Sequence, residues 1–172
     1  TIEGLSDPHG VAWSDGGTPF MPDDDLLFVT DTGRNRIAAY ALASGSARLA
    51  ATIGELGSGT GHFAGPLAVT VGRDAGVSTS DVYVADAHTR RIVRLGYRAG
   101  AFVWRGDAPS TADAIPSLAT DEWGNLYAAA PQQGVVLKFT AAREPLAELH
   151  DGLVSPRALT IPFSTVRDHR DG

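Results

Sequence analysis

The sequence contains no cysteine among its 172 residues. This absence excludes disulfide bonds, zinc-thiolate sites and a cysteine nucleophile, but an exported protein can lack cysteine as readily as a cytosolic one. The sequence also contains no apolar run close to the roughly 18 residues that a membrane-spanning helix needs. We therefore predict no membrane span, and the compartment is not determined by the cysteine count.

Basic charge is scarce as well. The chain has 14 Lys and Arg against 20 Asp and Glu, which gives a formal net charge of −6. This balance argues against a nucleic-acid partner, because phosphates attract basic surfaces. Hydrophobic residues make up 43% of the chain and charged residues 20%. That composition is typical of a folded globular protein rather than a disordered one.

Helical periodicity is absent, and an internal repeat stands in its place. Residues 26–40 (LLFVTDTGRNRIAAY) and residues 81–95 (DVYVADAHTRRIVRL) are two copies of one pattern, and residues 125–139 (NLYAAAPQQGVVLKF) are a third. A short strand-like run that begins near a proline comes before each copy, and a weaker strand comes after it. A unit of four short antiparallel strands at this spacing is typical of a β-propeller blade.

The predicted fold class is therefore all-β, an incomplete arc of a β-propeller with four-stranded antiparallel blades. We place the first blade at about residues 8–53, the second at about 66–105 and the third at about 115–149, and the first strand of a further blade at about 156–161.

Such an arc exposes two apolar blade faces, which are unfavourable in water. We expect the remaining blades of a propeller, or a protein partner, to cover them. The chain starts at Thr1 rather than Met, and we favour a fragment over two alternatives. These are an incompletely described part of a longer propeller and a ring that a second chain completes.

The linker IGELGSGTGHFAGP (53–66), the strand LAVTV (67–71) and the second copy of the repeat together resemble the NHL-repeat family. The shared pattern is a Gly-rich run with Phe and Pro, a small apolar strand, a Y-V-x-D strand and an R-[IV] strand. The chain departs from this pattern through insertions at 14–25 and 72–80, and through the third copy, which lacks the Asp and Arg.

In the two complete copies an Asp ends one strand and an Arg begins the next. Asp31 precedes Arg36, and Asp86 precedes Arg91, at the same spacing. In the third copy Ala130 and Val135 replace both partners together. Removing one partner would leave a half-buried charge unpaired, whereas removing both can be nearly neutral. We therefore interpret Asp31, Arg36, Asp86 and Arg91 as structural pairs.

His9 is the candidate metal ligand, because the inner strand of a blade begins near one mouth of the central channel. The resemblance implies this chemistry, since some NHL enzymes that cleave α-hydroxyglycine peptides hold a channel metal on histidines from several blades. The corresponding positions here are Leu67, Pro116 and Arg157. Zinc needs three or four converging ligands. We therefore expect no cofactor and a turn or channel-mouth role for His9, with a divalent metal as the alternative.

A second candidate for a divalent cation is the acidic run Asp23, Asp24 and Asp25. It lacks the alternating pattern of a calcium-binding loop, so a solvated loop is the default interpretation. The other histidines are expected in turns or on the surface: His62, His88, His150 and His169.

A basic stripe follows the second copy of the repeat. Alternate strand positions point to one face, so we interpret Arg90, Arg94 and Arg98 as an interaction surface for an acidic partner.

The leading functional hypothesis is a non-enzymatic interaction or scaffold module that binds another protein or macromolecule through a propeller face. The insertions in the first two blades would enlarge such a face. The alternative is an NHL-type lyase or lactonase-like enzyme whose channel metal is completed by blades outside this chain. Gly-rich repeat linkers and a composition rich in alanine and arginine favour a bacterial protein that is exported or displayed on the cell surface.

Overall fold

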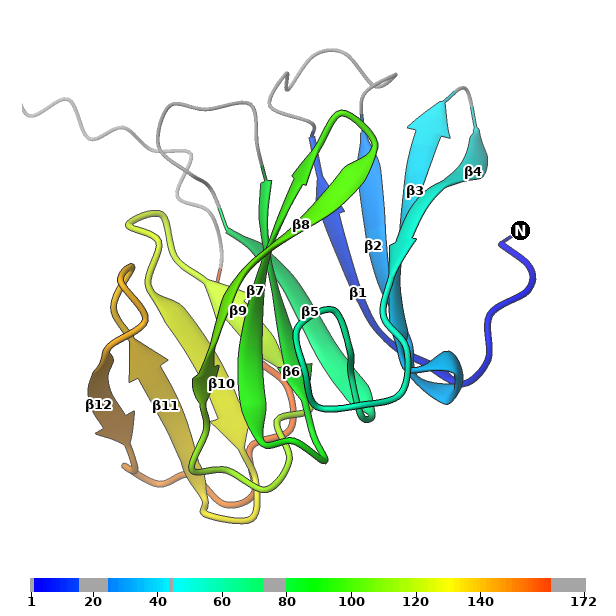
Figure 1. The fold of residues 1–172 in the computed structure, drawn as a ribbon. Helices are drawn as coiled ribbons and strands as arrows, with labels where there is room; N and C mark the ends of the chain where they lie inside the picture. The colour runs from blue at the N-terminus through cyan, green and yellow to red at the C-terminus, as the bar shows by residue number, and fades with distance from the viewer. Residues whose placement is uncertain (1, 16–24, 44, 73–79, 162–172) are drawn as a thin grey trace, which may run out of the picture.

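The structure is a computed structural model that describes residues 2–15, 25–43, 45–72 and 80–161. Over these residues the fold is all-β, with three four-stranded antiparallel sheets that stand side by side in Figure 1. Blade 1 comprises β1 (Pro8–Ser14), β2 (Leu26–Asp31), β3 (Arg36–Ala43) and β4 (Ser46–Ile53), with the 3-10 turn η2 (Thr32–Arg34) between β2 and β3. Blade 2 comprises β5 (Pro66–Gly72), β6 (Ser80–Asp86), β7 (Arg91–Arg98) and β8 (Ala101–Pro109). Blade 3 comprises β9 (Leu118–Thr120), β10 (Leu126–Ala130), β11 (Val135–Phe139) and β12 (Pro145–Leu149).

Within each sheet every strand pairs with the next strand along the chain. The repeated segment forms the two middle strands of each blade, β2 and β3, β6 and β7, and β10 and β11. The prediction of four-stranded antiparallel propeller blades is therefore confirmed. No helix in the described part of the chain is long and apolar enough to cross a membrane.

One predicted strand differs from the structure. Residues 156–161, expected as the first strand of a further blade, form no strand. A strand needs a ladder partner, and the second strand that would pair with this segment would have to come from residues after 161, beyond the described residues. The Leu159 amide of this segment donates a hydrogen bond of 3.0 Å to Ser117 Oγ, next to the start of β9.

The core lies between neighbouring blades rather than inside a single sheet. Blades 1 and 2 enclose an apolar cluster whose fully buried members include Phe28, Ile37, Phe63 and Leu95. Phe28 also packs edge-on against Tyr97 with ring centroids 5.3 Å apart. Blades 2 and 3 enclose a second cluster, so burial of apolar surface requires adjacent blades to stay in contact.

The inner strands of adjacent blades approach closely. A Cβ atom at Gly10 of β1 would lie 2.7 Å from the Leu67 carbonyl of β5, so only glycine fits there without displacement. Thr30 Oγ1 donates to the same Leu67 oxygen at 3.1 Å, and Thr32 Oγ1 donates to the Pro66 oxygen at 2.5 Å. These bonds fix the end of β2 and the turn η2 against the start of β5.

Blade 1 leaves part of its outward face open. On that face Val11 is 63% and Trp13 57% exposed, although Ile2 and Leu5 pack against the neighbouring Val29 cluster. Val11 and Trp13 therefore form an exposed apolar surface on this face of blade 1.

Candidate functional site

His9 lies at the beginning of β1, beside the contact between the inner strands of blades 1 and 2. Its side chain is 44% exposed. The ring atom Nδ1 lies 3.1 Å from the Asp7 carbonyl oxygen and 3.1 Å from Thr32 Oγ1. The local structure that positions this ring is the left-handed backbone at Asp7, which has φ of 51°, followed by the irregular pairing of β1 with β2.

The partners of His9 determine its tautomer. The Asp7 carbonyl oxygen can only accept a hydrogen bond, and the single hydroxyl proton of Thr32 is donated to Pro66. We therefore assign the proton of the neutral ring to Nδ1. The lone pair then lies on Nε2, and a histidine held in this way can accept a proton or bind a metal through Nε2.

The positions that correspond to His9 in the other blades do not complete a metal site. Leu67 and Pro116 carry no ligating side chain, and Arg157 is cationic and exposed. Among the described residues there is no group of three or more His, Cys, Asp or Glu side chains that could hold a metal ion. This part of the chain therefore offers one imidazole nitrogen, whereas a zinc centre needs three or four ligands.

The acidic run is only partly described. Asp23 and Asp24 lie outside the described residues, so only Asp25 is placed. Asp25 precedes β2 and is half-buried, and its backbone oxygen accepts the Leu42 amide at 2.9 Å.

The structure brings Asp31 and Arg36 together. The Asp31 carboxylate is completely buried, and Arg36 Nε lies 2.7 Å from its Oδ2 atom. Its Oδ1 atom accepts the Ser6 amide at 2.6 Å. Burial alone raises the pKa of Asp31, but the bonds from Ser6 and Arg36, with the nearby charge of Arg34, outweigh burial and hold that pKa below its ordinary value. The carboxylate is therefore a fixed anion that ties the N-terminal segment to blade 1.

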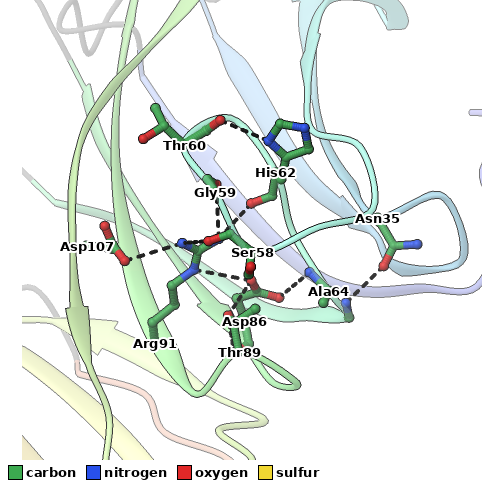
Figure 2. A network of polar contacts seen from close by, with 11 residues as sticks. Asn35, Ser58, Gly59, Thr60, His62, Ala64, Asp86, Thr89, Arg91 and Asp107 are labelled. Atoms are coloured by element: carbon green, nitrogen blue, oxygen red, sulfur yellow. Dashed lines mark hydrogen bonds and ion pairs between the residues drawn. The ribbon is translucent and has the colours of Figure 1, made fainter.

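Asp86 and Arg91 also meet, and their contacts extend into the linker between blades 1 and 2. Arg91 Nε lies 3.4 Å from Asp86 Oδ2, and Asp86 Oδ1 accepts the Ala64 amide at 2.7 Å. Figure 2 shows the Arg91 guanidinium pointing into the linker, where it donates to the Ser58 oxygen at 2.7 Å and the His62 oxygen at 2.8 Å. The nearly buried Arg91 thus holds the fold of a Gly-rich loop.

The three arginines of the expected interaction surface have different surroundings. Arg90 lies in the turn before β7 and forms an exposed ion pair of 3.3 Å with Asp113. Arg94 lies in the middle of β7 and points to Asp81, with Nη2 2.5 Å from Oδ2. Arg98 ends β7 and is exposed. Because β7 is eight residues long, the members of this stripe lie at different heights of the blade.

The sequence did not predict the pocket beside the Arg94 side chain. A pocket of about 210 Å³ lies there between blades 2 and 3, and Arg105 and Arg143 also line it. One signal was available: Tyr83 pairs with Arg94 across the strands as Tyr127 pairs with Lys138. The repeat thus places an aromatic ring beside a cation in both blades. Nothing in the sequence spacing showed that Arg143 reaches the same pocket from blade 3.

No protein-family model and no curated protein matches the sequence, but solved structures match the fold. A functionally unknown protein from Desulfotomaculum acetoxidans aligns with 94% of this chain at 17% identity and a TM-score of 0.70. The periplasmic gluconolactonase of Pseudomonas aeruginosa aligns with 88% at 14% identity and a TM-score of 0.63. Virginiamycin B lyase from Staphylococcus aureus aligns with 86% at 15% identity and a TM-score of 0.57.

These neighbours correct the functional hypothesis. The prediction of a non-enzymatic interaction or scaffold module is contradicted, because the neighbours named for an activity are a lactonase and a lyase. Composition and repeats could not separate the two classes, since a propeller scaffold and a propeller enzyme share the same strands. The chain spans only 48%, 41% and 42% of the lengths of these three proteins. The described residues are three blades of a β-propeller.

Proposed function

We propose that this chain contributes three blades to an NHL-type propeller enzyme of the lactonase or lyase kind, whose ring is completed by further blades. The observation that carries the proposal is the likeness of most of the chain to a lactonase and a lyase of the same fold. The resemblance of its repeats to the NHL pattern, with the Gly-rich linker between blades 1 and 2, supports the NHL assignment.

His9 is the residue of this chain that we assign to the chemistry. It stands at the beginning of an inner strand, and its Nδ1 atom is committed to Asp7 and Thr32. Nε2 therefore carries the lone pair and can take a proton from a water molecule or from the carbon next to a carbonyl group. The first transfer serves lactone hydrolysis and the second serves elimination, both by general-base catalysis.

A channel metal is the cofactor that the NHL resemblance implies. The described residues do not fit a metal centre by themselves, because His9 is the single imidazole at the relevant position and no cluster of three ligands is present among them. No step above is therefore derived through a metal. If the completed ring holds one, His9 Nε2 is the ligand that this chain would supply.

The test is the activity of the complete protein on a panel of lactones, with products separated so that hydrolysis and elimination are distinguished. We expect His9→Ala to lower kcat by about 100-fold or more, in the range of a lost general base. The matched control is His150→Ala, because His150 is 62% exposed and lies at the end of blade 3. No turnover of any lactone, or equal rates for His9→Ala and wild type, would contradict the proposal.

A further inference from the structure

The backbone on both sides of His9 is bonded to the end of the second strand of blade 1. Before the histidine, the Ser6 amide donates to Asp31 Oδ1 at 2.6 Å. After it, the Gly10 amide donates to Thr30 Oγ1 at 2.7 Å. These two bonds fix the path of the peptide chain at His9, and a separate contact orients its ring.

That contact comes from Thr32, the first residue of η2. Its Oγ1 atom lies 3.1 Å from His9 Nδ1, and the same hydroxyl donates to the Pro66 oxygen at the start of β5 at 2.5 Å. A carbonyl oxygen can only accept, so the hydroxyl proton is directed to Pro66 and a hydroxyl lone pair faces Nδ1. The result is a chain of two hydrogen bonds that runs from blade 1 through the threonine to blade 2, and each bond in such a chain strengthens the other.

The turn that carries Thr32 is itself fixed. The Asn35 amide donates to the Thr32 oxygen at 3.0 Å, and the Gly33 amide donates to the Ser6 oxygen at 2.8 Å. A Cβ atom at Gly33 would lie only 2.8 Å from that Ser6 oxygen, so this close approach requires glycine. The backbone on both sides of the threonine hydroxyl is therefore held in place, as a side chain that orients another group requires.

The threonine accompanies the histidine within this chain. The repeat aligns Thr32 with Ala87 in blade 2 and with Pro131 in blade 3, and neither residue has a hydroxyl group. The positions that correspond to the histidine in those blades are Leu67 and Pro116. The turn thus forms without a hydroxyl where there is no imidazole ring to orient.

We propose that Thr32 is a positioning residue that holds the neutral His9 ring with its proton on Nδ1 and its lone pair on Nε2. This inference rests on the proposed function, in which His9 Nε2 is the general base. When Nε2 takes a proton the ring becomes a cation, and the bond from Nδ1–H to the threonine hydroxyl becomes charge-assisted and stabilises the protonated base. Thr32 thus acts on the reaction through His9 rather than by contact with the substrate.

The direct test is the tautomer of His9 in the complete protein, measured from the nitrogen chemical shifts of its two ring atoms at a pH where the ring is neutral. The wild type should carry the proton on Nδ1. Thr32→Val keeps the shape of the side chain without the hydroxyl, and should move the tautomer ratio toward Nε2–H by about fivefold, the effect of one neutral hydrogen bond. Thr32→Ser should restore the ratio. A wild-type ring protonated on Nε2, or an unchanged ratio in Thr32→Val, would overturn the proposal.

The matched control is Thr30→Val. The Thr30 hydroxyl accepts the Gly10 amide and donates to the Leu67 oxygen at 3.1 Å, so it lies at the same junction of blades 1 and 2 but bonds to backbone groups. This variant should lower the free energy of unfolding and leave the tautomer ratio unchanged. An equal shift of the ratio in Thr30→Val and Thr32→Val would show that loosening of the junction is the cause, and would overturn the assignment to Thr32.

Activity is the second readout, and it separates this inference from the proposed function. On a lactone that the wild type turns over, Thr32→Val should lower kcat by about tenfold, the effect of one charge-assisted bond, with KM unchanged. Thr32→Ser should recover most of that loss. If the tautomer responds as expected and no lactone is turned over, the positioning of His9 stands and the proposed function fails. If lactones are turned over and the tautomer ratio does not respond, the positioning role alone is overturned.

Discussion

Blades 1 and 2 hold the segment that precedes them with a buried aspartate, whereas blade 3 holds its preceding segment with buried apolar side chains. In blades 1 and 2 a buried Asp at the end of the second strand accepts a backbone amide two residues before the blade's first proline, from Ser6 and Ala64 respectively. In blade 3 the equivalent residue is Ala130, and the preceding linker is held by burial of Ala112 and Ile115.

Blade 3 instead has its buried carboxylate at the opposite end of the sheet. Asp121 accepts the amides of Trp123 and Asn125 at 3.1 and 2.8 Å, and the Tyr127 hydroxyl at 3.0 Å. The linker before each blade is therefore anchored, but by different interactions: a buried carboxylate in blades 1 and 2, and buried apolar side chains in blade 3. In each blade the buried carboxylate accepts backbone amides that would otherwise lack an acceptor.

The largest effect is expected at the anchor of blade 2. Asp86→Ala removes the buried carboxylate that pairs with Arg91 and accepts the Ala64 amide. Because Asp107 still pairs with Arg91 at 3.3 Å, we expect a loss at the lower end of the range for a broken buried pair, about 3 kcal/mol in the free energy of unfolding. Urea denaturation measures this change. The double variant Asp86→Ala/Arg91→Val copies blade 3 and should recover part of the loss. A double variant whose loss equals the sum of the two single losses would contradict the pairing.

A smaller effect is expected at the hairpin of blade 3. Asp121→Ala removes the acceptor for two backbone amides, so we expect a loss of about 1–3 kcal/mol in the free energy of unfolding. Hydrogen exchange should show the loss of protection at the Trp123 and Asn125 amides, with blade 1 unaffected. Unchanged protection in this hairpin would show that other groups satisfy these amides.

The two carboxylates also predict an acid dependence. Burial raises the pKa of Asp121, but bonds from Asn125, Tyr127 and Trp123 outweigh it, so the pKa of Asp121 lies below its ordinary value, as does that of Asp31. The unfolded chain then binds protons first, and the stability that these groups add is complete above about pH 4 and is lost as pH falls further. Carboxyl NMR titration measures both values. In the double variant Asp31→Asn/Asp121→Asn the free energy of unfolding should depend less on pH below about pH 4. An unchanged pH dependence in that range would contradict the assignment.

The smallest effect is expected at the surface. Arg90 and Asp113 form an ion pair in which each side chain is 63% exposed. Such pairs contribute little, so Arg90→Gln should change the free energy of unfolding by less than about 0.5 kcal/mol. A loss as large as that of Asp86→Ala would show that exposure is a poor guide to anchoring in this chain.

Most of the fold could be predicted from the repeat, because the recurrence of Tyr83 as Tyr127 and of Asp86 as Asp31 aligns the middle strands of the blades. The repeat also indicated which Asp and Arg face each other across a turn. The linker contacts of Arg91 were not predictable, since its partners are backbone oxygens that leave no mark in the sequence.

The pocket between blades 2 and 3 could not be predicted from the sequence for a different reason. Arg143 and Tyr83 belong to different blades, and only the packing of one blade on the next places the Arg143 Cζ atom 4.2 Å from the centroid of the Tyr83 ring. The functional class was also mispredicted, because the residues that make a propeller an enzyme converge from the whole ring. The inner strands among the described residues carry one histidine, His9, and one histidine does not distinguish a scaffold from a catalyst.

The central proposal is that these three blades belong to a closed ring; the chain covers 48% and 41% of the lengths of two structures with which it aligns. Native mass spectrometry of the protein from its natural source tests this most directly. The account predicts a species heavier than this chain, either a longer polypeptide that contains the sequence or an assembly that covers Val11 and Trp13. A stable monomer of 172 residues with both blade faces open to water would contradict it.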